Sequence, residues 1–169
     1  MIIHCTKKLA GKLPDVSATA LTEASPLGSW HAHVYTIHRK NCLLFCHDDT
    51  RFTMFLPGLR KAEFSRLGFW FREAFVGSLG YMGVPDNQVR RAELALGPVV
   101  LDTACDRSVQ GSLNQMRYML EGCVEEVPDV MLLNPLKVTA WLSHYPVTVR
   151  GGKECWMADE AMRERVMGL

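Results

Sequence analysis

Three histidines and an aspartate between residues 31 and 49 are the first residues of this chain that suggest chemistry. They are His31, His33, His47 and Asp49. Imidazole nitrogens and carboxylate oxygens are ligands that zinc takes in proteins. Two runs rich in aromatic and β-branched residues, WHAHVYTIH and CLLFCHDDT, flank the short polar segment RKN, a pattern that predicts a β-hairpin. If RKN is a three-residue loop, His33 faces His47 and His31 faces Asp49, with opposed Cβ atoms about 4.5 to 5.5 Å apart.

The pairing register of this hairpin decides whether the metal site exists. A two-residue loop at Lys40 and Asn41 would instead gather His31, His33, Cys46 and Asp48 on one face, again a set of zinc ligands. Because both registers offer zinc ligands, the presence of these residue types does not by itself indicate a metal site. We favour the simpler interpretation, a polar solvent-facing surface with the apolar hairpin residues turned to the core. We therefore predict no cofactor, with a zinc ion as the alternative.

The segment HDDTR suggests a second chemistry. His47, Asp48 and Asp49 would form a catalytic group in which the imidazole acts as a general base and a carboxylate orients the ring. Arg51 would hold an anionic substrate. No nucleophile motif such as G-x-S-x-G accompanies these residues. The structural interpretation, in which the acids end the strand and pair with Arg51, is the one that we favour.

The stretch CDRSVQGSLNQM, residues 105–116, is a candidate anion site. An apolar stripe starting at Val109 predicts a helix with Asp106 or Ser108 as its N-cap, and the free amides of a helix start attract anions. The predicted anion-binding residues are Arg107, Ser108, Ser112 and Asn114, together with Arg51 from the hairpin. The Asp106 carboxylate would compete for the same amides, and neither standard phosphate-loop motif is present. Gly111 costs about 1 kcal/mol inside a helix, so we favour close packing of a second backbone on it over anion binding.

Bulk composition narrows the class of protein. The 169 residues are 48% hydrophobic and 22% charged, typical of one globular domain, which we predict over residues 1–169. The formal charge of +1 disfavours broad binding to DNA or other polyanions, although a small specific anion site remains compatible with it. The six cysteines show no C-x-x-C spacing and are expected to be reduced thiols. No signal peptide or membrane-spanning run is evident, so we expect a cytoplasmic protein that does not enter a membrane.

Hydrophobic periodicity predicts the elements that must position these residues. Strands are predicted at 1–6, 30–38, 42–50, 52–58, 99–104 and 147–150, and a loop at 15–29. Helices are predicted at 7–13, 61–82, from 109 onward, 136–145 behind an Asn134 N-cap and Pro135, and 158–168. Because strands gather early and helices late, we predict an α+β fold. Its antiparallel sheet, with an N-terminal strand and a central hairpin, would pack against three or four helices.

Aromatic residues off the predicted core stripes mark a candidate surface. Phe69 and Trp70 lie off the helical stripe that contains Phe71. Trp30, Trp141 and Trp156 lie near polar residues, where each indole could be partly buried and hydrogen-bonded. An exposed aromatic patch would indicate a partner surface, whereas burial on both sides of a helix is the plainer expectation.

Three stretches together, MIIHCTKKL, SWHAHVYTIHRKNCLLFCHDDTRF and DRSVQGSLNQM, resemble an uncharacterised bacterial family labelled as plasmid-related or as a domain of unknown function. The resemblance covers residues 1 to about 150. It implies a small cytosolic bacterial protein often linked with mobile elements, and it brings no catalytic residues.

Two functions remain open at this point. The first is a non-catalytic binding protein that contacts a protein partner in a mobile-element, defence or counter-defence setting. The second is a small toxin-like enzyme acting on a nucleotide or RNA, with phosphate at the helix start near Arg107 and proton transfer at His47. The enzyme requires His47 and Arg107 to converge on one pocket, whereas the binding protein requires an exposed patch.

Overall fold

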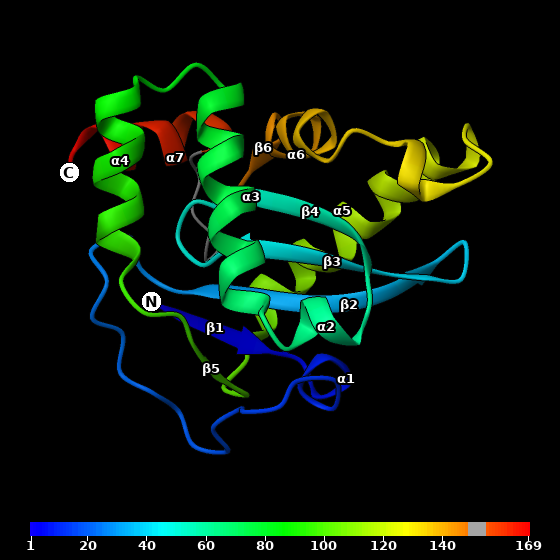
Figure 1. Cartoon of the computed structure of the whole chain (residues 1–169). Helices are drawn as coiled ribbons and strands as arrows, with labels where there is room; N and C mark the ends of the chain where they lie inside the picture. The colour runs from blue at the N-terminus through cyan, green and yellow to red at the C-terminus, as the bar shows by residue number, and fades with distance from the viewer. Residues whose placement is uncertain (149–154) are drawn as a thin grey trace.

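A five-stranded sheet with helices on both faces forms the centre of the molecule (Figure 1). The computed structural model describes residues 1–148 and 155–169. The strand order is β4-β3-β2-β1-β5. The five strands are β1 (Ile2–Cys5), β2 (Trp30–Ile37), β3 (Lys40–His47), β4 (Thr53–Leu59) and β5 (Val100–Asp102). The predicted α+β class is confirmed.

The sheet is mixed rather than wholly antiparallel. Strands β2, β3 and β4 form the expected antiparallel meander, but β1 pairs in parallel with both β2 and β5. The parallel register places His4 beside His31 and also beside Asp102. A second, two-stranded sheet joins β6 (Pro146–Val147) to β7 (Trp156–Met157). The rest of the strand predicted at 147–150 includes residues 149 and 150, which lie outside the described residues.

Most helices follow the predicted periodicity, but one predicted helix is broken in two and the helix at residues 86–96 was not predicted. They are α1 (Lys7–Ala10), α2 (Lys61–Phe64), α3 (Leu67–Tyr81), α4 (Asp86–Leu96), α5 (Arg107–Glu125), α6 (Pro135–Ser143), α7 (Ala158–Met167) and the 3₁₀ helix η1 (Val130–Leu132). The single helix predicted at 61–82 is two helices, α2 and α3, separated at Ser65 and Arg66. Five members of its predicted apolar stripe are buried, and the sixth, Met82, is partly buried; the five are Phe64, Leu67, Phe71, Phe75 and Leu79.

One face of the sheet, the α3 face, carries an aromatic core. Trp30 makes edge contacts with Phe71 and Phe75 of α3, at ring-centroid distances of 5.0 and 5.6 Å. All three side chains are fully buried. Met162 and other apolar residues of α4 and α7 complete this core.

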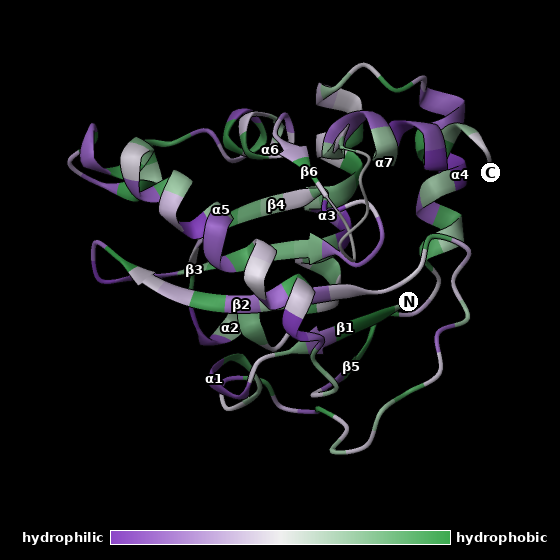
Figure 2. Ribbon diagram, turned by 180° about the vertical axis from the view of Figure 1, so that it is seen from behind, coloured by the Kyte–Doolittle hydropathy of each residue, from purple (hydrophilic) through white to green (hydrophobic). Residues whose placement is uncertain are grey.

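The opposite face, the α5 face, is covered by α5, while α6 packs along β4 (Figure 2). The Asp106 side chain accepts hydrogen bonds from the amides of Ser108 and Val109, and the Asn134 side chain caps α6 in the same way. The predicted Asn134 cap is confirmed, and of the two caps predicted for α5, Asp106 is the one observed. Thr139 and Ser143 of α6 accept amide hydrogen bonds from β4, so α6 satisfies polar groups of this edge strand that would otherwise face solvent.

Both predicted registers of the β2–β3 hairpin are wrong. Ile37 pairs with Lys40, so the turn consists of His38 and Arg39, whose φ angles are 45° and 63°. This register places His31 opposite Cys46 and His33 opposite Leu44. Side chains of His33 and His47 consequently point to opposite faces of the sheet, because successive strand residues alternate.

The expected role of Gly111 is also wrong. A Cβ added at Gly111 would meet nothing within 4 Å, and the residue is exposed. Within residues 1–148 and 155–169, no second backbone approaches α5 there, so this packing does not require the glycine.

Candidate functional site

His47 lies inside the protein rather than at a reactive surface. Its side chain is fully buried, Nε2 donates to the Leu27 carbonyl at 2.6 Å, and Nδ1 accepts from the Thr50 amide at 3.1 Å. Burial lowers the pKa of His47 to about 4, more than the Leu27 carbonyl and nearby acids raise it. Since both ring nitrogens are occupied and the ring is neutral near pH 7, His47 offers no free nitrogen to a substrate or a metal.

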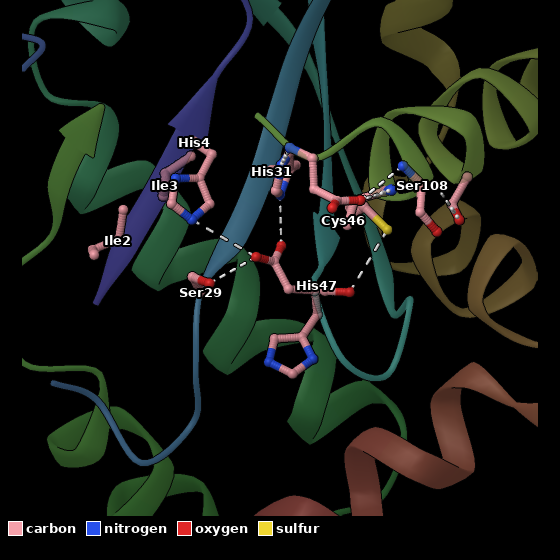
Figure 3. Close-up of polar contacts among 12 residues, drawn as sticks. Ile2, Ile3, His4, Ser29, His31, Cys46, His47 and Ser108 are labelled. Atoms are coloured by element: carbon pink, nitrogen blue, oxygen red, sulfur yellow. Dashed lines mark hydrogen bonds and ion pairs between the residues drawn. The ribbon is translucent and has the colours of Figure 1, made fainter. Parts of the chain in front are cut away.

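His31 joins three elements on the α5 face. Its Nδ1 donates to Asp48 Oδ1 at 2.6 Å, and its Nε2 accepts from the amide of Asp106 at 2.6 Å. Ser29 donates a further hydrogen bond to Asp48 at 2.7 Å. Burial alone would raise the pKa of Asp48, but the His31 and Ser29 contacts outweigh burial and the net pKa is lowered. These bonds connect β2, the end of β3 and the start of α5 (Figure 3).

His4 and Asp102 extend this arrangement, and the sequence did not single them out. His4 Nδ1 donates to Asp102 Oδ1 at 2.6 Å, and its Nε2 lies 3.7 Å from Asp48 Oδ2. Asp102 is fully buried and accepts amide hydrogen bonds from Leu21 and Ala104. We call His4, His31, Asp48 and Asp102 the His–Asp network. The parallel pairing of β1 brings these residues together, and no local sequence pattern predicts that pairing.

The residues predicted to bind an anion at the start of α5 do not form one site. Arg51 is buried and donates to the Asp48 carbonyl and to Ser108 Oγ. Arg107 is exposed, and the amides of Ser108 and of Val109 are taken by the Asp106 carboxylate. The helix start is therefore closed by its own cap. Ser112 donates to the Ser108 carbonyl, and Asn114 lies further along the helix at a separate hollow.

The four predicted metal ligands are not brought together. His47 faces the α3 side, His33 bonds to Thr6 at 2.8 Å, and Asp49 pairs with Arg165 at 2.9 Å. Among residues 1–148 and 155–169, no group of three or more His, Cys, Asp and Glu side chains is placed to hold a metal ion. All six cysteines lie in these ranges and are free thiols, as expected.

An apolar groove lies on the surface between the end of α5, η1 and α6. It encloses about 420 Å³ and is lined by Cys123, Glu126, Val127, Leu132, Leu133, Asn134, Lys137, Val138 and Trp141. We call it the α5–α6 groove. Leu132 is 68% exposed and Trp141 is 45% exposed, so two large apolar side chains are open to solvent beside the same hollow. The sequence marked Trp141 only as lying near polar residues, and it did not mark Leu132 at all.

Acidic residues gather at the same end of α5. Glu125 ends the helix and Glu126 is its C-cap, and both are exposed. Asp129 follows before η1, and Lys137 is the one basic residue among the described residues that line the groove. A helix C-terminus carries partial negative charge, so acids there are unfavourable for the helix itself.

The fold and these surfaces define an α+β protein with a mixed sheet, an internally bonded polar network and an exposed apolar groove. The chain belongs to the family described as "Domain of unknown function (DUF6933)", whose model matches residues 2–161. No curated protein and no solved structure matches the chain. Within the described residues, every helix is too short or too polar to cross a membrane.

Proposed function

We propose that this chain is a non-catalytic binding protein whose α5–α6 groove receives an apolar segment of a partner protein flanked by basic residues. The observation that carries the proposal is the exposure of Leu132 and Trp141 beside a hollow of about 420 Å³. Tryptophan is enriched at the energetic centres of protein interfaces, where it fills or lines a desolvated pocket.

The placement of polar residues supports binding over the proposed nucleotide- or RNA-acting enzyme. His47 is buried on the α3 side, whereas Arg107 is exposed on α5, across the sheet. A proton-transfer group and an anion holder must meet one substrate, and these two do not share a pocket. Both ring nitrogens of His31 and both carboxylate oxygens of Asp48 have hydrogen-bond partners. Such a fully bonded network holds helices and strands in place.

Charge complementarity specifies the basic flank of the partner segment. Glu125, Glu126 and Asp129 outnumber Lys137 around the groove. Lysine or arginine residues on the partner would offset both these carboxylates and the negative end of the α5 dipole.

Selection from a phage-displayed random peptide library tests this proposal. The wild-type protein is expected to enrich peptides with two or three large apolar residues next to Lys or Arg. Leu132→Asp should lose these peptides by at least about tenfold, because a charge would be desolvated at the contact. Leu94→Asp is the matched control, since Leu94 is 82% exposed but lies on α4.

Three outcomes would overturn the proposal. In the first, enriched peptides bind Leu132→Asp as tightly as they bind the wild type. In the second, the enriched peptides carry acidic flanks. In the third, sedimentation shows a wild-type dimer that Leu132→Asp dissociates, which would assign the groove to a second copy of this chain.

The cellular setting is a further part of the proposal. We propose a cytoplasmic, bacterial protein that acts with a mobile element or a defence or counter-defence system. The free thiols fit a reducing compartment. The bacterial and mobile-element part rests only on the resemblance of the three sequence stretches quoted above. The mass-spectrometric identity of a partner captured by the wild type and lost by Leu132→Asp would test it.

A further inference from the structure

A second hollow, of about 330 Å³, lies on the α5 face between α1 and α5. Its lining includes Lys7, Lys8, His33, Tyr35, Gln110 and Asn114. We call it the α1–α5 pocket. It is separate from the α5–α6 groove, with which it shares no lining residue.

The α1–α5 pocket is electropositive. Lys7 and Lys8 line one wall, and the described residues contribute no acidic side chain to the lining. The guanidinium of Arg117 lies over the Tyr35 ring, 5.4 Å from its centroid, and forms an ion pair with Glu121 at 2.9 Å. Among the described residues, the lining therefore has two lysines and no carboxylate, and the Arg117–Glu121 ion pair lies at its edge.

His33 presents an open nitrogen at the base of this pocket. Its Nδ1 bonds to Thr6 Oγ1 at 2.8 Å, and its ring packs against Tyr35 at a centroid distance of 4.4 Å. In the part of the chain that the structure describes, Nε2 of His33 has no hydrogen-bond partner. Burial lowers the pKa of His33, and the positive charges of Lys8 and Arg117 lower it further, so the ring is neutral near pH 7.

Amide side chains form the opposite wall. Gln110 and Asn114 are four residues apart on α5, which places them on the same helix face, and both line the pocket. Each can donate hydrogen bonds to an oxygen-rich ligand. The pocket thus combines two ammonium groups, two amides and one imidazole nitrogen.

We propose that the α1–α5 pocket binds a phosphate monoester of about mononucleotide size. Lysine binds phosphate as a point charge, and a phosphate monoester carries about −1.5 to −2 charges at pH 7. The volume lies at the lower end of the range of about 300 to 1,000 Å³ found for small-molecule sites. Phosphate oxygens contact Lys7 and Lys8, and the remainder of the ligand lies along His33, Gln110 and Asn114.

Amide-resolved NMR titration tests the pocket with four probes: AMP, ribose 5-phosphate, inorganic phosphate and uncharged adenosine. The phosphorylated probes are expected to shift the amide signals of Lys7, Lys8, Gln110 and Asn114, and adenosine is not. A response to AMP alone would assign the nucleotide as the ligand, and equal responses to all three anions would assign the phosphate group. Absence of any response at millimolar AMP and phosphate overturns the proposal.

Charge-reversal variants separate specific binding from general attraction of anions. Lys8→Glu is expected to weaken AMP binding by at least about tenfold. Lys61→Glu should bind as the wild type does, because Lys61 is an exposed residue of α2 outside the pocket. Equal loss in both variants would show that net charge alone attracts the nucleotide, and unchanged binding in Lys8→Glu would likewise reject the pocket.

The titration of His33 gives a readout that does not depend on affinity. Binding of an anion stabilises the imidazolium, so AMP is expected to raise the pKa of His33 toward its ordinary value, and adenosine is not. An unchanged His33 titration in saturating AMP would place the ligand elsewhere. Leu132→Asp should bind AMP normally, so failure of this pocket and failure of the α5–α6 groove are distinguishable.

Discussion

The histidines of this chain show how local environment decides the role of one residue type. His47 is enclosed and neutral, with both nitrogens bonded to nearby backbone groups. His31 is equally buried but bridges a carboxylate and a helix amide. His33 retains an open nitrogen beside lysines. Composition and spacing treat these three residues alike, and only their burial and partners separate them.

The buried neutral His47 predicts a particular pH dependence of stability. An unfolded histidine has a pKa of about 6.5, whereas the pKa of folded His47 is about 4. Between these values the unfolded state binds the proton and the folded state does not. The free energy of unfolding is therefore expected to fall by roughly 3 kcal/mol, through this residue, as the pH drops from about 6.5 to about 4. Below about pH 4, protonation of His47 should cause no further decrease.

Urea unfolding at a series of pH values checks this prediction. His47→Gln should be less stable at pH 7 but should show a flatter decline between pH 6.5 and 4. His38→Asn, in the exposed turn, should keep the wild-type slope. Parallel curves for the wild type and His47→Gln would contradict the prediction, as would an NMR titration of His47 with an ordinary pKa.

Glu126 predicts opposite effects on stability and on binding. Glu126→Lys places a positive charge at the C-terminus of α5, so the free energy of unfolding should rise by about 0.3 to 1 kcal/mol. The same change should weaken the peptides selected on the α5–α6 groove, because their basic flank would meet a like charge. Denaturation and peptide titration measure the two effects. Glu73→Lys, exposed on α3, should leave peptide affinity unchanged, and a Glu126→Lys protein with full affinity would contradict the charge argument.

At the level of elements, helices with strong end signals were predictable. The Asp106 and Asn134 caps and the apolar stripe of α5 are local features, and each was confirmed. The register of β2 with β3 was not predictable in the same way. Residues 42–47 of β3 are all buried because helices cover both faces, so the polar alternation that reveals a register is absent. His38 and Arg39 also lack the glycine or asparagine that usually marks a turn with positive φ.

The His–Asp network was missed for a related reason. Its four residues come from distant segments, and the parallel partners of β1 are set by the path of the chain between strands. A local pattern can place His4 on a strand, but it cannot name Asp102 as its neighbour.

Gly111 predicts a stabilising substitution in α5. Nothing lies within 4 Å of an added Cβ, and alanine is favoured over glycine in a helix by up to about 1 kcal/mol. Gly111→Ala should therefore raise the free energy of unfolding by that amount in urea or thermal denaturation. Gly28→Ala is the contrasting variant, because Gly28 has a φ of 85° and its added Cβ would lie 3.2 Å from Arg165. A destabilised Gly111→Ala protein would contradict the prediction, because it would show that another group lies close to Gly111.

At the level of the whole molecule, one sheet separates two hydrophobic cores. Met162 of α7 is fully buried in the core on the α3 face, and Leu120 of α5 is fully buried in the core on the α5 face. Both cores are built on the same strands β2, β3 and β4, whose alternate residues supply each side. Loss of packing on either face should loosen strands that the other face needs.

The shared sheet predicts that residues 1–169 unfold as one cooperative unit. Met162→Ala and Leu120→Ala should each lower the free energy of unfolding by about 2 to 5 kcal/mol, because each leaves a cavity in a fully buried site. In each variant, far-UV circular dichroism and tryptophan fluorescence should report the same midpoint. Trp30 lies in the α3-face core, whereas the far-UV signal comes from helices on both faces, α5 included. Two layers that unfold separately would give different midpoints, because the far-UV signal would also contain the transition of the layer that the substitution does not touch. Coincident transitions in both variants would show that the C-terminal helix and α5 depend on the same sheet, although they lie on opposite sides of it.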